Sequence, residues 1–165
     1  AGITNTPDTR RLLALAIRRL QPRSVIAPAP APYGRHPDHR VASELARDAF
    51  YHAGLKRYDA NGRPHRPHKI LYALAYREDP VKPTFVVDVT RTFAAKMRAI
   101  RCYRSQFEGA RQAGEIFPTG QDLLSLIRTQ SEHYGSLIRA RYGEPYFTHE
   151  TVRVEDVVEM GAQSL

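Results

Sequence analysis

The sequence has little of what marks disulfide-bonded or membrane-spanning proteins. It contains one cysteine, Cys102, and no tryptophan. A single cysteine cannot form a disulfide within the chain, so we expect a reducing, cytoplasmic location. No apolar run approaches the roughly 18 residues that a membrane-spanning helix needs. We therefore expect no membrane span.

A glycine-rich phosphate loop and a recognisable nucleic-acid-binding motif are also absent from the sequence. The net charge is nevertheless +8, from 25 Lys and Arg against 17 Asp and Glu, which is typical of proteins that bind nucleic acids or small anions. The arginines are scattered, in pairs such as Arg10-Arg11 and Arg18-Arg19, rather than gathered in a run. We expect no nucleic-acid partner; an anionic small substrate, or acidic residues in a part of the protein outside this chain, would explain the imbalance.

Helical and strand-like segments follow one another along the 165 residues, a length that suits a single domain over 1–165. Thr6-Pro7 predicts the start of a helix that ends at Gln21-Pro22, with its arginines mostly off the apolar face. Further patterns predict a buried parallel strand over 24–27, a helix from Pro37, strands over 70–76 and 84–89, a helix of about four turns from 92, a helix over 123–138 and a strand-like segment over 151–158. This order predicts an α/β fold of three layers, with a mostly parallel, Rossmann-like sheet.

The side chains best suited to catalysis or ligand binding lie in the motif Arg35-His36-Pro37-Asp38-His39. Pro37 favours the first position of a helix and keeps His36 in the preceding loop, while His39 falls in the first turn. Two imidazoles then converge on one small volume, at the carboxyl end of a strand where α/β sheets place their ligands. Such a pair can ligate a metal, transfer a proton or stabilise an oxyanion, or it can be no more than a capped helix start.

Several motifs resemble the LmbE and PIG-L family of zinc-dependent N-acetylglucosaminyl deacetylases, and within it the bacillithiol-biosynthesis deacetylases. They are Tyr33-Gly34-Arg35-His36-Pro37-Asp38-His39, Ala53-Gly54-Leu55, Tyr103-Arg104-Ser105-Gln106-Phe107, the opening Gly2-Ile3-Thr4-Asn5-Thr6-Pro7 and the stretch from Tyr142-Gly143-Glu144-Pro145-Tyr146 to Asp156. The resemblance implies hydrolysis of the acetamide of a small N-acetylglucosaminyl glycoside, such as N-acetylglucosaminyl malate, to an amine and acetate. It also implies Zn²⁺ as the cofactor.

The same resemblance implies roles for the residues of the corner. His39 would ligate the metal, and His36 would stabilise the oxyanion or donate a proton. Asp38 would orient a histidine. Tyr33 would approach the substrate, or simply pack in its loop, and Arg35 would clamp a carboxylate of the substrate, or form a surface ion pair.

The chain departs from the family in one respect. Family members carry a motif of the type Ala-His-Pro-Asp-Asp-Glu after their first strand, which supplies a histidine and an aspartate to zinc and another aspartate as general base, and no such string is present here. We expect the chain to be the carboxy-terminal portion of a longer protein, without the first strand and helix, and inactive by itself. A binding protein that keeps the fold without the chemistry is the alternative, and an exposed sheet edge leaves homo-oligomer formation open.

Overall fold

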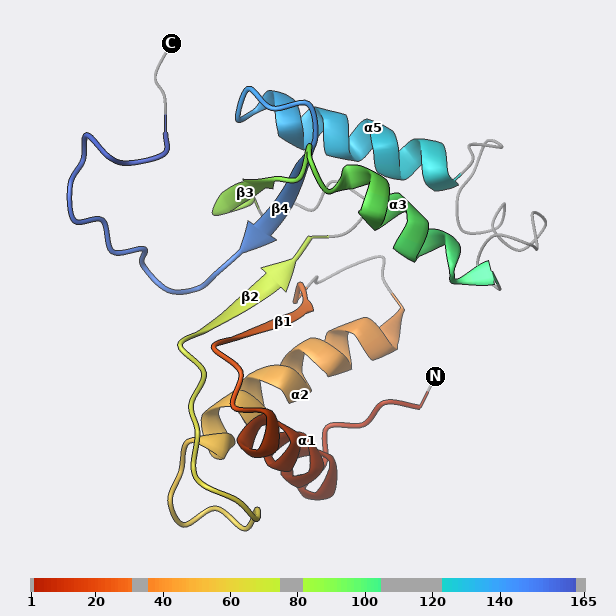
Figure 1. Ribbon diagram of the computed structural model, residues 1–165. Helices are drawn as coiled ribbons and strands as arrows, with labels where there is room; N and C mark the ends of the chain where they lie inside the picture. Colours follow the sequence, from red (N-terminus) through yellow and green to blue (C-terminus); the bar gives the residue numbers. More distant parts are fainter. Residues whose placement is uncertain (1, 31–35, 75–81, 105–122, 163–165) are drawn as a thin grey trace. The chain divides into compact units, whose positions relative to one another are not determined.

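The computed structural model describes residues 2–30, 36–74, 82–104 and 123–162, and these form two compact units (Figure 1). Unit 1 comprises Ala1–Ala75, Asp79–Thr84 and Tyr146–Glu150, and unit 2 comprises Tyr76–Glu78, Phe85–Pro145 and Thr151–Leu165. The elements are α1 (Pro7–Leu20), β1 (Ser24–Pro28), α2 (Pro37–Ala53), β2 (Lys69–Ala73), β3 (Phe85–Asp88), α3 (Phe93–Arg101), α5 (Leu123–Ser136) and β4 (Gly143–Phe147).

Helix α1 begins and ends where the sequence predicts. The Thr6 hydroxyl accepts a hydrogen bond from the Thr9 amide, and the Thr9 side chain accepts one from the Thr6 amide, so that the two residues form a capping box. At the other end Gln21 adopts a left-handed conformation, with φ 47° and ψ 48°. This residue closes the helix and directs the chain into β1.

The sheet is mixed rather than mostly parallel. In unit 1, β1 pairs with β2 in parallel from Ser24↔Lys69 to Pro28↔Ala73, and β2 pairs antiparallel with the last residues of β4. The hydrogen-bonded strand order is β1-β2-β4-β3. The prediction of a parallel strand β1 is confirmed, but the prediction that it is buried is wrong, because Ile26 is 61% exposed and only Ala27 is buried.

The core of unit 1 contains small residues from α2. The helix buries Ser43, Ala46, Ala49 and Ala53. Ala46 packs with Ile70 and Tyr72 of β2, while Ala49 and Ala53 pack with Ala14 and Ile17 of α1. The sequence predicts a buried face of Val41, Ala42, Leu45, Ala49 and Phe50, of which only Ala49 is fully buried. The difference arises because α1 and α2 pack closely through small side chains, which leaves no space between the helices for larger ones.

Arg18 is the exception to the prediction that the arginines of α1 lie mostly off its apolar face. It is 4% exposed, and its guanidinium donates hydrogen bonds to the carbonyl oxygens of Ala53, Leu55 and Ala60. Ala53 is the last residue of α2, and its carbonyl lies at the end of the helix that carries partial negative charge. The buried cation is therefore stabilised by peptide dipoles.

Unit 2 has its own core. Val89, Phe93, Met97, Ile127 and Tyr142 form a buried cluster, in which the rings of Phe93 and Tyr142 stack with centroids 3.7 Å apart. The Lys96 ammonium lies 2.9 Å from the Glu144 carboxylate, and this ion pair joins α3 to β4.

Two glycines of unit 2 bring the end of α5 against β4. A Cβ on Gly143 would lie 2.7 Å from the Gly135 nitrogen, and a Cβ on Gly135 would lie 2.8 Å from the Tyr142 nitrogen. Both distances are shorter than real Cβ atoms tolerate. The two backbones can meet only because neither residue has a side chain.

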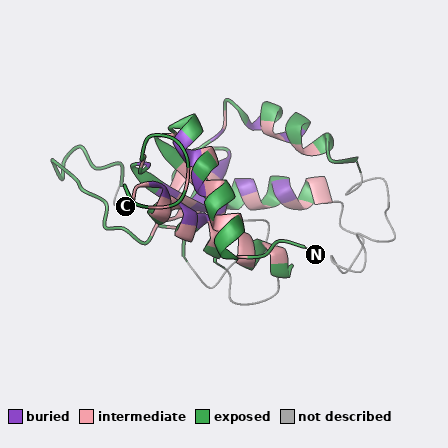
Figure 2. Cartoon of the chain, turned by 90° about the horizontal axis from the view of Figure 1, so that it is seen from below, coloured by how far each residue is buried: buried purple, intermediate pink, exposed green. Residues whose placement is uncertain are grey.

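Several predicted boundaries are wrong in unit 2. Helix α3 has 9 residues, fewer than four turns. Helix α5 ends at Ser136, and the two apolar residues that follow it, Leu137 and Ile138, are exposed. Residues 151–158, predicted as a strand, form no strand and are exposed (Figure 2), whereas β4 was not predicted. The sequence also predicts a loop over 109–120, and this segment lies outside the described residues.

The α/β class and the Rossmann-like architecture are confirmed, and among the described strands β1 and β2 pair in parallel while β2 and β4 pair antiparallel. The single domain over 1–165 stays a prediction beside the two compact units. Among the described helices, none is long and apolar enough to cross a membrane.

Candidate active site

The corner around His36 is built by the start of α2. Pro37 occupies the first helical turn and His36 is the N-cap, as the sequence predicts. The Asp38 amide donates a hydrogen bond of 3.2 Å to His36 Nδ1, and the His39 amide donates one of 2.9 Å to the His36 carbonyl. An imidazole thus does here what the oxygen of Ser, Thr, Asp or Asn does at most helix starts.

The cap determines the tautomer of His36. Because the Nδ1 lone pair accepts the Asp38 amide proton, the neutral imidazole carries its own proton on Nε2. The His36 side chain is 53% exposed. The corner therefore presents an N–H donor, held in one orientation by the helix start.

The two imidazoles lie near each other at this end of α2. The ring centroids of His36 and His39 are 6.5 Å apart, with the ring planes inclined by 57°. Both residues are exposed. One small ligand can contact both rings, which agrees with the convergence predicted from the sequence.

Asp38 is held by the amino-terminal segment. The Gly2 amide donates to both carboxylate oxygens, at 3.3 and 3.2 Å. Oδ2 lies 3.8 Å from His36 Nδ1. Asp38 thus lies beside His36, although His36 Nδ1 receives its hydrogen bond from the backbone, and its predicted role of orienting a histidine stays a prediction.

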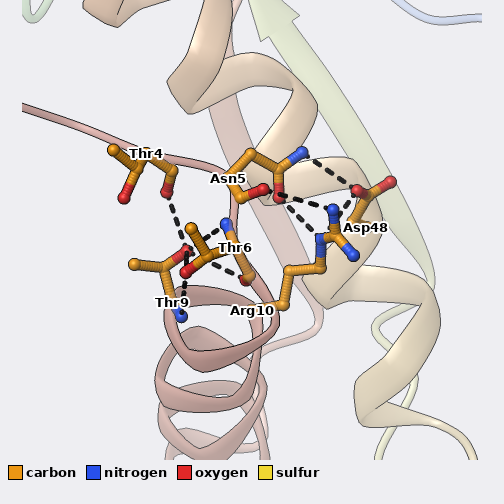
Figure 3. Close-up of polar contacts among 6 residues, drawn as sticks. All are labelled: Thr4, Asn5, Thr6, Thr9, Arg10 and Asp48. Atoms are coloured by element: carbon orange, nitrogen blue, oxygen red, sulfur yellow. Dashed lines mark hydrogen bonds and ion pairs between the residues drawn. The ribbon is translucent and has the colours of Figure 1, made fainter.

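A second contact fixes the same segment farther along α2, and it was not predicted as part of the site. Asn5 Nδ2 donates to Asp48 Oδ2 at 3.0 Å, Arg10 Nε lies 3.1 Å from the same oxygen, and Arg10 also donates to the Asn5 side chain at 2.7 Å (Figure 3). Only the resemblance of the opening Gly2–Pro7 to family members pointed to this segment. Residues 2–5 therefore contact α2 at two places, Asp38 in its first turn and Asp48 farther along the helix.

The described residues do not fit a metal by themselves. They contain no group of three or more His, Cys, Asp or Glu side chains placed to hold a metal ion, whereas a catalytic zinc site needs about three protein ligands. His39 offers one nitrogen at a helix end with partial positive charge. Any metal at this corner would need ligands beyond the described part of the chain.

The remaining predicted positions divide into two groups. Tyr33 and Arg35, the predicted substrate-binding residues, lie outside the described residues, as do Ser105 and Gln106. For Asp88, at the end of a predicted strand, the sequence favours a structural role over orienting another group, and in the structure its Oδ1 accepts a 2.9 Å hydrogen bond from the Thr90 amide in the turn before α3.

Comparisons with known proteins support the deacetylase resemblance. No family model matches the chain. It is 32% identical over 150 residues to a diacetylchitobiose deacetylase of Thermococcus kodakarensis, covering 87% of this chain and 52% of that protein. The chain thus spans about half the length of this curated relative.

Several solved structures are also similar to this chain. A conserved protein of Thermus thermophilus matches with a TM-score of 0.75 and 31% identity, over 93% of this chain and 63% of that one. An N,N'-diacetylchitobiose deacetylase of Pyrococcus horikoshii, bound to an inhibitor, matches with a TM-score of 0.62 and 30% identity, over 86% and 51%. A 4-carboxy-2-hydroxymuconate hydratase of Pseudomonas putida matches at 0.69 with 19% identity, over 92% and 62%, and shows the fold alone.

Proposed function

We propose that this chain is part of an N-deacetylase of the LmbE and PIG-L type, which hydrolyses the acetamide of an N-acetylglucosaminyl substrate to a free amine and acetate. The observation that carries the proposal is the 32% identity to a diacetylchitobiose deacetylase over 87% of the chain. The fold alone would not carry it, because a hydratase has a similar fold.

The geometry of the corner suits the reaction. The acetamide oxygen gains negative charge as water adds to the carbonyl carbon, and a fixed N–H donor aimed at that oxygen stabilises it. His36 supplies such a donor at Nε2, because its Nδ1 is engaged by the Asp38 amide. The Asp38 carboxylate lies beside the same ring, with Oδ2 3.8 Å from Nδ1.

Zinc belongs to the proposal as a cofactor of the whole protein. It would supply a Lewis acid that activates water and polarises the carbonyl. His39 is the proposed ligand from this chain, and the other ligands would come from beyond the described residues, since these do not form a three-ligand set.

The group attached to the N-acetylglucosaminyl unit of the substrate is also a proposal. A malate glycoside, as in bacillithiol biosynthesis, would place a carboxylate where Arg35 can bind it bidentately, and Tyr33 would lie near the sugar. Arg35→Lys in the full-length protein should then lower kcat/KM for N-acetylglucosaminyl malate more than for N-acetylglucosamine. An equal loss on both substrates would contradict the carboxylate role. The proposed compartment is the cytoplasm.

The roles of the two histidines are tested by acetate release and metal content in the full-length protein. His36→Asn keeps a good N-cap but removes the imidazole, so it should retain bound zinc and melt like the wild type while losing about a hundredfold or more in kcat. His39→Ala should lose both zinc and activity. Equal zinc content in the two variants would refute the assignment, and a metal-free, inactive wild type would favour a binding protein that keeps only the fold.

A further inference from the structure

A cleft in unit 2 gathers arginines. Its volume is about 530 Å³, within the range of small-molecule sites. Four arginines line it, two from α3, one from α5 and one from the turn before β4: Arg98, Arg101, Arg128 and Arg141. The floor contains the buried residues Phe93, Met97 and Tyr142.

Two of these arginines are held in place by the aromatic floor. Arg128 Nη1 donates to the Tyr142 hydroxyl at 2.8 Å, and its Cζ lies 5.5 Å from the Phe93 ring centroid. The Arg141 Cζ lies 5.3 Å from the Tyr142 ring centroid. A guanidinium stacked on a ring keeps its in-plane N–H donors for another partner. The floor thus orients these two cations without neutralising them.

The donors of the cleft have few partners. Within the described part of the chain, no carboxylate pairs with any of the four guanidinium groups, and the bond from Arg128 to Tyr142 is the only hydrogen bond that their side chains donate. Arg98 and Arg101 also complement the dipole at the carboxyl end of α3, but this does not apply to Arg128 and Arg141. Like charges in one cleft repel, and a bound anion removes that repulsion.

We infer that this cleft binds a small multivalent oxyanion of the phosphate class, either free or carried on a small organic molecule. Arginine forks match phosphate oxygens bidentately, and the concave cleft suits a compact ligand. Single-stranded nucleic acid fits less well, because bases need exposed rings for stacking, whereas Phe93 is 4% and Tyr142 6% exposed.

The test is isothermal titration of the full chain with pyrophosphate at low salt, with inorganic phosphate, citrate and a short single-stranded DNA as further probes. We expect saturable pyrophosphate binding with one site, weakened by added salt. Arg98→Gln and Arg101→Gln should each weaken it about tenfold, since each removes a charge-assisted contact. Arg128→Lys keeps the charge but loses the fork, and should weaken it as well.

The matched control is Arg11→Gln, which removes the same charge from an exposed position on α1. It should bind pyrophosphate like the wild type, and thermal melting should show that all variants are folded. The inference is overturned if pyrophosphate does not saturate, if Arg11→Gln weakens binding as much as Arg101→Gln, or if citrate or DNA binds more tightly than pyrophosphate.

Discussion

Buried Arg18 in unit 1 and the arginine cleft in unit 2 show two ways in which this basic chain holds its charge. Arg18 is 4% exposed, and three carbonyl oxygens accept its hydrogen bonds. The cleft arginines are exposed and, apart from the bond from Arg128 to Tyr142, donate no side-chain hydrogen bonds among the described residues. Donors without partners, rather than positive charge itself, therefore indicate a binding site.

The largest effect should come from Arg18→Met. This change fills the space but leaves the carbonyls of Ala53, Leu55 and Ala60 without their donor, which should lower the free energy of unfolding by about 3 kcal/mol. Urea denaturation measures it. The adjacent, exposed Arg19→Met is the control and should change stability by about 0.5 kcal/mol or less. Similar losses in both variants would show that Arg18 is not held as described.

An intermediate effect is expected at Arg10 and Asp48, where a partly exposed arginine does have a carboxylate partner. A double-mutant cycle of Arg10→Gln and Asp48→Asn should give a coupling free energy of about 0.5–1 kcal/mol. The exposed pair Arg40 and Glu44 of α2 should give about 0.3 kcal/mol in the same experiment. A larger coupling at Arg40 than at Arg10 would contradict the ranking by exposure.

The smallest effect concerns Asp88, an exposed carboxylate with partners of its own. Hydrogen bonds from the Thr90 side chain, and then from its backbone, hold the pKa of Asp88 below the ordinary value of 3.8. Because the folded pKa is the lower one, the stabilisation is present above about pH 3.8 and is lost as the pH falls through the folded value. Carbon-13 NMR titration should show the pKa of Asp88 rising toward 3.8 in Thr90→Val. An unchanged titration would assign the shift to other groups.

The helices of unit 1 begin where the sequence predicts because the residues that set each start are local. Thr6 with Pro7, and His36 with Pro37, determine where α1 and α2 begin, and no distant residue is needed to establish either start. The burial of Arg18 could not be predicted, since its carbonyl partners are 35–42 residues away. The convergence of His36 and His39 was predicted from spacing, but the contact of Gly2 with Asp38 depends on tertiary structure.

In unit 2 the observed strands differ from the predicted ones where strand pairing outweighs the β-propensity of the residues. Gly143 and Pro145 argue against a strand, yet β4 forms because it is hydrogen-bonded to its neighbour β3. Residues 151–158 contain several valines that favour a strand, but no described strand pairs with them. A strand forms only when it pairs with another strand, and the local sequence does not show which segment that partner is.

The contact of Gly135 with Gly143 limits how this protein can change over evolutionary time. A methyl group on either residue meets backbone atoms, which cannot rotate away as a side chain can. No second substitution at the partner glycine relieves the clash, because the partner already has the smallest side chain. A substitution at either position therefore requires the end of α5 to move away from β4. The close approach of the two backbones thus constrains both positions together.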